Sequence, residues 1–276
     1  MAAQESRGIL DARIEAEKLR TKYANDPRQN SFRVLVTGES GTGKTHLLRT
    51  ARLPVHIDSF DPGGTLVLRD MITNGDIVAD TIYEQEDRTE PTMFREWCRT
   101  FEARVRGKYF ESFSTYCLDS STLWADAIIS WIQGKDKRAG EAPNFYKDYN
   151  PQKVEIQNWM QRILALPCDV VITGHLEGEY DDKVVGEDVR RDLQRYRYMT
   201  TGKGAIIIPL LFDEQWTTVV KQVANSIQYQ ILTSHWGYYR GRTRIGRGKF
   251  AQFEAANIKT LLKKAGWPAT DKPKLF

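Results

Sequence analysis

Residues 38–45 read Gly38-Glu39-Ser40-Gly41-Thr42-Gly43-Lys44-Thr45, which fits the pattern G-x-x-x-x-G-K-[ST]. The mainly apolar residues 32–36 before this stretch predict a short strand, and residues 46–52 after it predict the start of a helix. Glycines at these positions let the backbone turn tightly, so that successive amides and the helix N-terminus face a phosphate. The stretch therefore predicts an α/β fold with a loop that holds the phosphates of ATP.

Two residues of this loop have specific expected roles. Lys44 is expected to reach the β- and γ-phosphates, and the Thr45 hydroxyl is expected to ligate magnesium. A second magnesium contact should come from a carboxylate at the end of a neighbouring strand. Asp119 ends the predicted strand 115–119 and is the candidate for that contact. The same residue is also placed to cap the helix that follows it.

Hydrolysis requires a further residue that orients or deprotonates the attacking water. Many P-loop ATPases carry a glutamate directly after the strand-end aspartate, but here that position is Ser120. Asp61, after the predicted strand 55–58, is then the best candidate for the catalytic base. His175 follows the predicted strand 169–173 and is a candidate sensor of the γ-phosphate. A lone histidine at a strand end is more often a surface or turn residue.

The composition is that of an ordinary globular protein. Hydrophobic residues make up 41% and charged residues 28% of the 276 residues. No stretch approaches the roughly 20 apolar residues that span a bilayer, and the first residues lack the pattern of a secretory signal. Cys98, Cys117 and Cys168 are too few and too scattered for a disulfide framework or a zinc site. We expect a cytoplasmic protein of a bacterium or an infected host cell, with no membrane partner.

Strands alternate with helices through most of the chain, which predicts βαβ units and a mainly parallel sheet flanked by helices. The C-terminal part differs, because it predicts a hairpin and a closing helix. Further strands are expected at residues 65–69 and 205–210, a hairpin between 228–233 and 237–245, and helices at 8–24, 92–104, 123–132, 154–166 and 255–265.

Taken in order, these pieces resemble the RecA-like ATPases, and among them the phage-type nucleotide-binding proteins related to single-strand annealing recombinases. The resemblance covers roughly residues 31–265. It is carried by GESGTGKT (38–45), HIDSFDPGG (56–64), YCLDSS (116–121), VITGH (171–175), and TTGKGAIIIPLLFDE (200–214) followed by YQILT (229–233) and RTR (242–244). It implies a RecA-like ATPase domain over 31–265, with an N-terminal helical extension over 1–30 and a C-terminal tail over 266–276.

The resemblance also implies roles for single residues. Thr45 and Asp119 match the magnesium contacts, and His175 matches the polar switch between the nucleotide and the DNA-facing loop. Lys203 resembles the lysine that approaches ATP on a neighbouring subunit. The acid that the family carries after its second strand falls on Phe60, and Asp61 lies one position later. This departure leaves the identity of the base and the rate of hydrolysis open.

In RecA-like proteins the loops that face DNA follow the aspartate-bearing and sensor strands, which here are residues 134–150 and 177–200. The second loop interleaves arginine with tyrosine, and its candidate DNA-binding residues are Arg190, Arg191, Arg195, Tyr196 and Arg197. Arginine neutralises phosphate, and tyrosine offers a face on which an unpaired base can stack. The alternative is a mobile charged lid.

The C-terminal part is strongly basic. Residues 203–276 carry 12 lysines and arginines against 4 acidic residues, a net charge of +8, whereas the chain as a whole carries +4. Arg240, Arg242 and Arg244 alternate along a predicted strand and so share one face, which is a candidate to bind phosphate. Arg242 and Arg244 are also candidates to reach the nucleotide of a neighbouring subunit. A solvated edge strand protected by charge is the alternative.

These observations favour a RecA-like ATPase that uses ATP and Mg²⁺ and binds single-stranded DNA in phage-type recombination, annealing or replication. It is expected to form a homo-oligomer and to meet a replication or recombination protein. The alternative is a P-loop motor or loader that acts on a protein partner in helicase loading or DNA packaging. A non-hydrolysing nucleotide-binding scaffold and a small-molecule kinase are weaker alternatives.

Overall fold

The computed structural model describes residues 2–185, 188–200, 204–224 and 226–276. Its main sheet runs in the order β11-β9-β8-β1-β5-β4-β2-β3, and β10 pairs with the start of β8. The strands from β8 to β3 are parallel to one another. They are β1 (Arg33–Thr37), β2 (Val55–Ser59), β3 (Ile77–Asp80), β4 (Thr115–Asp119), β5 (Asp169–Gly174) and β8 (Glu214–Val223). The mainly parallel sheet predicted from the sequence is confirmed.

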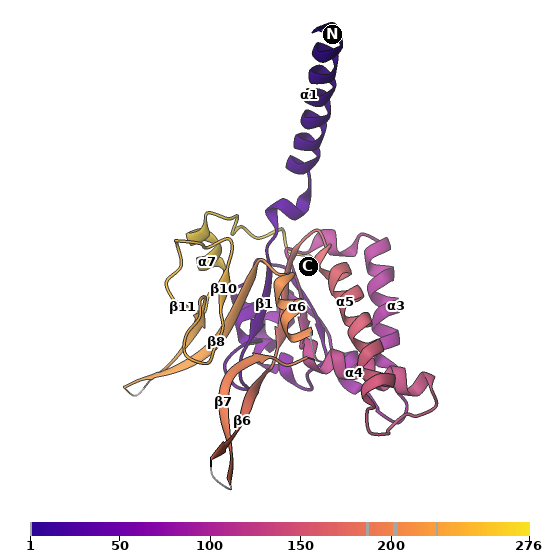
Figure 1. The fold of residues 1–276 in the computed structure, drawn as a ribbon, viewed down its shortest axis with the longest axis vertical. Helices are drawn as coiled ribbons and strands as arrows, with labels where there is room; N and C mark the ends of the chain where they lie inside the picture. Colours follow the sequence, from indigo (N-terminus) through magenta and orange to yellow (C-terminus); the bar gives the residue numbers. More distant parts are fainter. Residues whose placement is uncertain (1, 186–187, 201–203, 225) are drawn as a thin grey trace.

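Helices cover both faces of this sheet (Figure 1). Leu35 of β1 packs with the helices of one face, whereas Val34 and Val36 pack on the other, as the period of two along a strand requires. The first face is covered by α3 (Met93–Arg106), α4 (Ser121–Lys135) and α5 (Asn150–Leu164), and the second by the short α2 (Arg69–Thr73) and by α7 (Ile258–Ala265). The core is therefore a sheet between two helical layers.

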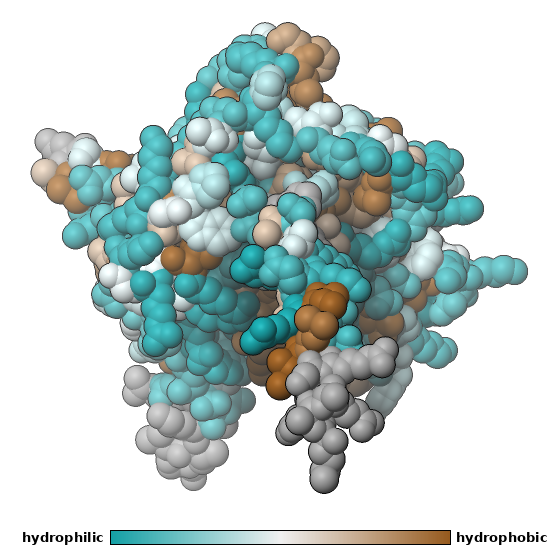
Figure 2. Space-filling view, turned by 90° about the horizontal axis from the view of Figure 1, so that it is seen from above, coloured by the Kyte–Doolittle hydropathy of each residue, from teal (hydrophilic) through white to brown (hydrophobic). Residues whose placement is uncertain are grey.

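Three elements project from this core (Figure 1). The helix α1 (Ala2–Ala24) stands alone at one end, and its side chains from residue 9 to residue 24 are exposed. At the opposite end lie the hairpin of β6 (Leu176–Val185) with β7 (Asp188–Tyr198) and the hairpin of β8 with β9 (Ser226–Leu232). Seen from above, the surface is mainly hydrophilic with separate small apolar groups (Figure 2). None of the described helices combines the length and hydrophobicity needed to cross a bilayer.

Two predicted strands are helical instead. Residues 205–210 form α6 (Gly204–Leu210), in which Ala205, Ile208 and Pro209 are buried with the spacing of a helix. Residues 65–68 fall in a 3₁₀ helix (Gly64–Leu68) and Arg69 begins α2, after a turn at Gly63, where φ is +72°. In both cases a short apolar run rich in β-branched residues gave a strand signal that tertiary packing overrode.

The predicted C-terminal hairpin is also different. β9 pairs with β8 and with β11 (Phe253–Ala255), not with residues 237–245, of which only β10 (Arg242–Thr243) is a strand. The sequence prediction missed β8, although Thr217-Thr218-Val219-Val220 are residues that favour strands. β8 lies between β1, to which it is parallel, and β9, to which it is antiparallel. The antiparallel partner of β9 on this side is therefore β8 and not residues 237–245.

Asp58, on β2, is the centre of a buried polar network. Its carboxylate accepts hydrogen bonds from Trp97 Nε1 and Tyr116 Oη, both at 2.8 Å, and from Arg104 at 2.9 Å. The ring of His56 lies 2.9 Å away. Burial opposes the charge, but His56 and Arg104 hold the pKa of Asp58 below its ordinary value. The network fixes β2 against α3 and β4.

We expect Asp58→Asn to lower the free energy of unfolding by about 3–5 kcal/mol, because it breaks the buried ion pair with Arg104, which then keeps only its ion pair with Asp80 at 2.6 Å. Urea unfolding followed by tryptophan fluorescence measures this loss. The matched control is Asp136→Asn, since Asp136 is an exposed carboxylate 3.4 Å from Arg138. Equal losses in the two variants would contradict the role given to the network.

Candidate functional site

The carboxyl ends of four neighbouring parallel strands bring the predicted site residues together. The stretch 38–45 follows β1, Asp119 is the last residue of β4, Asp61 comes two residues after β2, and His175 directly follows β5. Because β5 lies between β1 and β4, His175 leaves the sheet between the glycine-rich loop and Asp119. Ligands of open α/β sheets bind at this edge.

The loop 38–45 requires glycine at several positions. Gly41 and Gly43 have φ of +78° and +87°, which side chains other than glycine rarely adopt. At Gly38 an added Cβ would lie 2.2 Å from Thr218 Oγ1 on β8. The helix predicted over residues 46–52 is only a 3₁₀ turn (His46–Thr50), since the chain becomes extended at Ala51. Backbone amides of the loop, rather than a long helix dipole, are therefore the anion-binding feature.

Lys44 is folded back into the loop. Its Nζ donates hydrogen bonds to the carbonyl oxygens of Gly38 at 3.1 Å and Glu39 at 2.9 Å, and the side chain is buried. Burial lowers the pKa of Lys44, against the opposing effect of Asp119 and Asp61. The ammonium is thus held next to the position where the loop amides would receive a phosphate.

Asp119 is held by hydroxyl groups on both sides. Thr45 Oγ1 donates to Asp119 Oδ2 at 2.7 Å, and Thr173 Oγ1 of β5 donates to Oδ1. Burial raises the pKa of Asp119, and the two hydroxyl donors oppose that rise. The carboxylate is directed at Thr45, and it is Ser120 that occupies the N-cap position of α4, without a side-chain cap bond. A carboxylate and a hydroxyl oxygen are ligands that suit Mg²⁺.

Asp61 lies at the same edge, beside Asp119. Ser120 Oγ donates to Asp61 Oδ1 at 2.6 Å, and the amide of Asp61 donates to the Asp119 carbonyl at 3.3 Å. Phe60, in contrast, is buried in the core and stacks on Tyr83. Of these two positions, only Asp61 therefore offers a carboxylate at the site.

The sequence analysis missed Glu84. Its carboxylate accepts hydrogen bonds from Ser59 Oγ at 2.7 Å and from the Gly63 amide at 2.9 Å. These bonds fix the turn that carries Asp61. The only signal in the sequence was an acidic residue shortly after a further strand, β3, which is too common a pattern to single out one residue.

His175 joins this edge to the β6–β7 hairpin. Its amide donates to Thr122 Oγ1 at 3.0 Å, and its carbonyl accepts from the Met199 amide at 2.9 Å. Burial and the nearby Lys44 ammonium lower the pKa of its imidazole, whereas Asp61 raises it. The pKa of the His175 imidazole therefore depends on the charges of both Lys44 and Asp61.

Two tyrosines flank the loop, a position that was not predicted for either of them. An added Cβ on Gly43 would lie 3.0 Å from the ring of Tyr229, which comes from β9. Tyr239 donates its hydroxyl to Glu39 Oε1 at 2.7 Å. Since Tyr239 and Glu39 are 200 residues apart, no local pattern predicts their contact.

Residues 177–200, predicted as a loop, form most of the β6–β7 hairpin, because β6 and β7 pair over ten residue positions. Its described arginines are paired with acids: Arg195 with Glu179, and Arg197 with Glu177 at 3.1 Å. Arg191 pairs with Asp182 at 3.2 Å in the same way. Much of the positive charge expected there is therefore balanced within the hairpin.

The remaining candidates differ in what can be described. The backbone of Arg190 lies in β7, but its side chain is outside the described residues, as is Lys203 altogether. The Arg242 guanidinium donates to the carbonyls of Pro209 at 2.6 Å and Phe212 at 2.9 Å, and Arg244 donates to that of Leu210 at 3.1 Å. Arg242 and Arg244 thus bind carbonyls at the end of α6 in their own chain.

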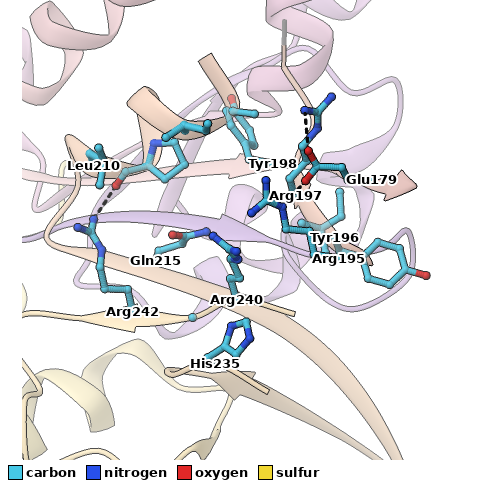
Figure 3. Close-up of a pocket in the computed structure, with 15 residues that line it drawn as sticks. Glu179, Arg195, Tyr196, Arg197, Tyr198, Leu210, Gln215, His235, Arg240 and Arg242 are labelled. Carbon is cyan, nitrogen blue, oxygen red and sulfur yellow. Dashed lines mark hydrogen bonds and ion pairs between the residues drawn. The ribbon is translucent and has the colours of Figure 1, made fainter. Parts of the chain in front are cut away.

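A cavity of about 600 Å³ lies between the hairpin, α6 and β10. Figure 3 shows the residues that line it. Arg195, Arg197 and Glu179 lie on the hairpin side, and Arg240 reaches toward them from the other side (Figure 3). The Arg240 carbonyl accepts a hydrogen bond from Thr217 Oγ1 at 2.8 Å, but its guanidinium has no hydrogen-bond or ion-pair partner among the described residues. Ile206 and Leu210 of α6, which are 61% and 55% exposed, give the cavity an apolar wall.

A family model described as AAA domain matches residues 30–245. A search of curated proteins finds no match. Solved structures include a KaiC-like protein from Pyrococcus horikoshii (12% identity, TM-score 0.39, 73% of this chain and 77% of that one) and the flagellar accessory protein FlaH from Methanocaldococcus jannaschii (13%, 0.40, 80% and 83%). A type III secretion ATPase of pathogenic bacteria is 12% identical, with a TM-score of 0.42 over 68% and 52%.

The charges around His175 predict that two substitutions shift the pKa of its imidazole in opposite directions. We expect Lys44→Met to raise the pKa of His175 toward the ordinary value of about 6.5, because a neighbouring cation is removed. Asp61→Asn should lower it, since a neighbouring anion is removed. A pH titration of the His175 imidazole by NMR measures both shifts. Shifts in the same direction would show that these residues do not face His175.

Proposed function

The chain belongs to the AAA domain family, and from that membership we propose that it binds ATP with Mg²⁺ and hydrolyses it. The observation that carries the proposal is the 2.7 Å hydrogen bond between Thr45 and Asp119, beside the buried Lys44. A glycine loop alone would support only phosphate binding. The carboxylate and hydroxyl next to it add a place for the metal ion on which phosphoryl transfer depends.

Each residue of the edge has a distinct role in this proposal. Amides of the loop 38–45 bind the phosphates, and Lys44 exchanges its two carbonyl partners for phosphate oxygens. Thr45 and Asp119 hold Mg²⁺, which would neutralise charge that develops on the phosphates. Thr173 keeps the Asp119 carboxylate turned toward Thr45.

We assign the orientation of the attacking water to Asp61. Ser120 holds this carboxylate at the same edge as Asp119, and Glu84 binds Ser59 and Gly63 on either side of it. His175, kept neutral by its lowered pKa, is then a hydrogen-bonding partner for the γ-phosphate rather than a cation. This arrangement supports the role of catalytic base that was predicted for Asp61.

We further propose that single-stranded DNA is the polymer on which the ATPase acts, in recombination, annealing or replication of the phage type. Two cavities lie beside the hairpin, and the charged residues that line them favour one of the two as the place where DNA phosphates bind. The cavity of Figure 3 is lined by four arginines and one acid: Arg195, Arg197, Arg240, Arg242 and Glu179. The other, of about 520 Å³, is lined by two arginines and three acids: Arg88, Arg197, Asp126, Glu141 and Glu177. Phosphates would enter the first.

The second candidate function is a motor or loader that acts on a protein partner. The exposed apolar residues of α1 favour it, since Ile9, Leu10 and Leu19 are each more than half exposed. A homo-oligomer is part of both proposals. Arg242 and Arg244 are bound within their own chain, which gives no support to a role at a neighbour's nucleotide.

We expect Lys44→Ala to abolish nucleotide binding, and Asp61→Asn to bind Mg-ATP but to hydrolyse it at least about 100-fold more slowly. Phosphate release at saturating ATP measures the rate, and a fluorescent nucleotide measures binding. Asp136→Asn removes an exposed carboxylate elsewhere and should match the wild type. Wild-type turnover by Asp61→Asn would remove Asp61 from the mechanism, and no turnover by the wild type would leave a nucleotide-binding scaffold.

Arg240→Ala should weaken binding of a labelled oligothymidylate and reduce the slope of log affinity against log salt by about 1, because one phosphate contact is lost. Arg106→Ala, which removes a 73%-exposed arginine on α3, should leave binding unchanged. If the wild type binds no oligonucleotide at low salt, the DNA proposal fails. Loss of a partner protein on deletion of residues 2–24 would then favour the loader.

A further inference from the structure

Glu39, the second residue of the phosphate loop, is held at both ends. Its carbonyl oxygen accepts hydrogen bonds from Lys44 Nζ at 2.9 Å and from Thr42 Oγ1 at 2.7 Å. Its carboxylate accepts the hydroxyl of Tyr239 at 2.7 Å. Whatever moves Lys44 therefore acts on a residue that also contacts the C-terminal part of the chain.

Tyr239 in turn contacts the β6–β7 hairpin. Its ring stacks on that of Tyr196, with the centroids 4.8 Å apart and the planes at 14°. The amide of Tyr196 donates to the carbonyl of Tyr238 at 2.9 Å, so the backbones of the two segments are also joined. Tyr196 lies between Arg195 and Arg197, the hairpin arginines that line the cavity of Figure 3.

We infer that Tyr239 is a positioning residue that couples the nucleotide in the phosphate loop to the β6–β7 hairpin, through Glu39 on one side and Tyr196 on the other. This inference rests on the proposed binding of ATP. It assigns a regulatory role to a residue outside the phosphate loop and outside the hairpin. The nucleotide then changes the hairpin and its cavity without touching either.

In this coupling, phosphate oxygens compete with the carbonyl oxygens of Gly38 and Glu39 for the Lys44 ammonium group. An ammonium group has three donors, and two of them hold the carbonyls of Gly38 and Glu39. Phosphate oxygens that draw Lys44 away remove one of the two side-chain donors to the Glu39 carbonyl and leave it with Thr42 Oγ1, while Tyr239 still holds the Glu39 carboxylate. Burial and the bond to Glu39 raise the pKa of Tyr239, so its hydroxyl remains a donor at neutral pH. The stacked rings pass the displacement to the hairpin.

A second connection runs through His175, which directly precedes β6. It is independent of Tyr239, because His175 contacts Thr122 and Met199 through its backbone. A variant at Tyr239 therefore separates the two connections. By thermodynamic linkage, the coupling is reciprocal. If the nucleotide changes the affinity of the hairpin for a ligand, that ligand changes the affinity for the nucleotide by the same factor.

The test compares amide hydrogen exchange of residues 176–185 and 188–198 with and without a saturating non-hydrolysable ATP analogue and Mg²⁺. We expect the analogue to change exchange of these amides in the wild type. Tyr239→Phe, which keeps the ring stack but removes the hydroxyl, should lose at least half of that change. Glu39→Gln keeps an oxygen acceptor for Tyr239 and should retain it. Tyr238→Phe, an exposed neighbouring position, is the matched control and should also retain it.

The outcomes separate this inference from the proposal on which it rests. If a fluorescent analogue does not bind the wild type, the proposed ATP binding fails. If it binds and the hairpin amides do not respond, the coupling is overturned. If Tyr239→Phe binds the analogue and responds as fully as the wild type, the coupling exists but does not pass through Tyr239, and the inference is wrong.

Discussion

Parallel pairing of β1, β5, β4 and β2 is the constraint on which the rest of the molecule depends. The carboxyl ends of parallel strands meet at one edge, so residues far apart in the sequence become neighbours there without a special device. The insertion of β5 between β1 and β4 does more. It supplies Thr173 to hold Asp119, and it releases the chain at His175, between the phosphate loop and the carboxylate, to begin the β6–β7 hairpin.

The sequence predicted the features that depend on local chemistry. The loop 38–45, the strand that ends at Asp119 and the amphipathic helices each carry their own pattern, and the structure has them. It did not predict features that depend on distant partners. Residues 205–210 look like a strand until burial selects a helix, and β8 was missed because its role comes from pairing with β1. The contact of Tyr239 with Glu39 has no local signal at all.

Charge on the hairpin shows the same limit. Arginine alternating with tyrosine along residues 190–198 is a strong pattern when β7 is considered alone. The opposing strand places Glu177 and Glu179 beside Arg197 and Arg195, and these pairs reduce the charge open to a polyanion. Among the arginines that line the cavity of Figure 3, Arg240 is the one whose guanidinium has no hydrogen-bond or ion-pair partner among the described residues. The cross-strand register, not the arginine count, decides where a phosphate is best received.

The packing of β8 on the phosphate loop has a consequence for biosynthesis. Thr218 contacts Thr42 from 176 residues further along the chain, and it also closes the space beside Gly38. A ribosome therefore completes the phosphate loop long before it delivers the strand against which the loop is packed. Such long-range contacts make folding slow and late. Nascent chains shorter than about 220 residues carry the whole motif yet lack Thr218, against which Thr42 and Gly38 pack in the folded protein.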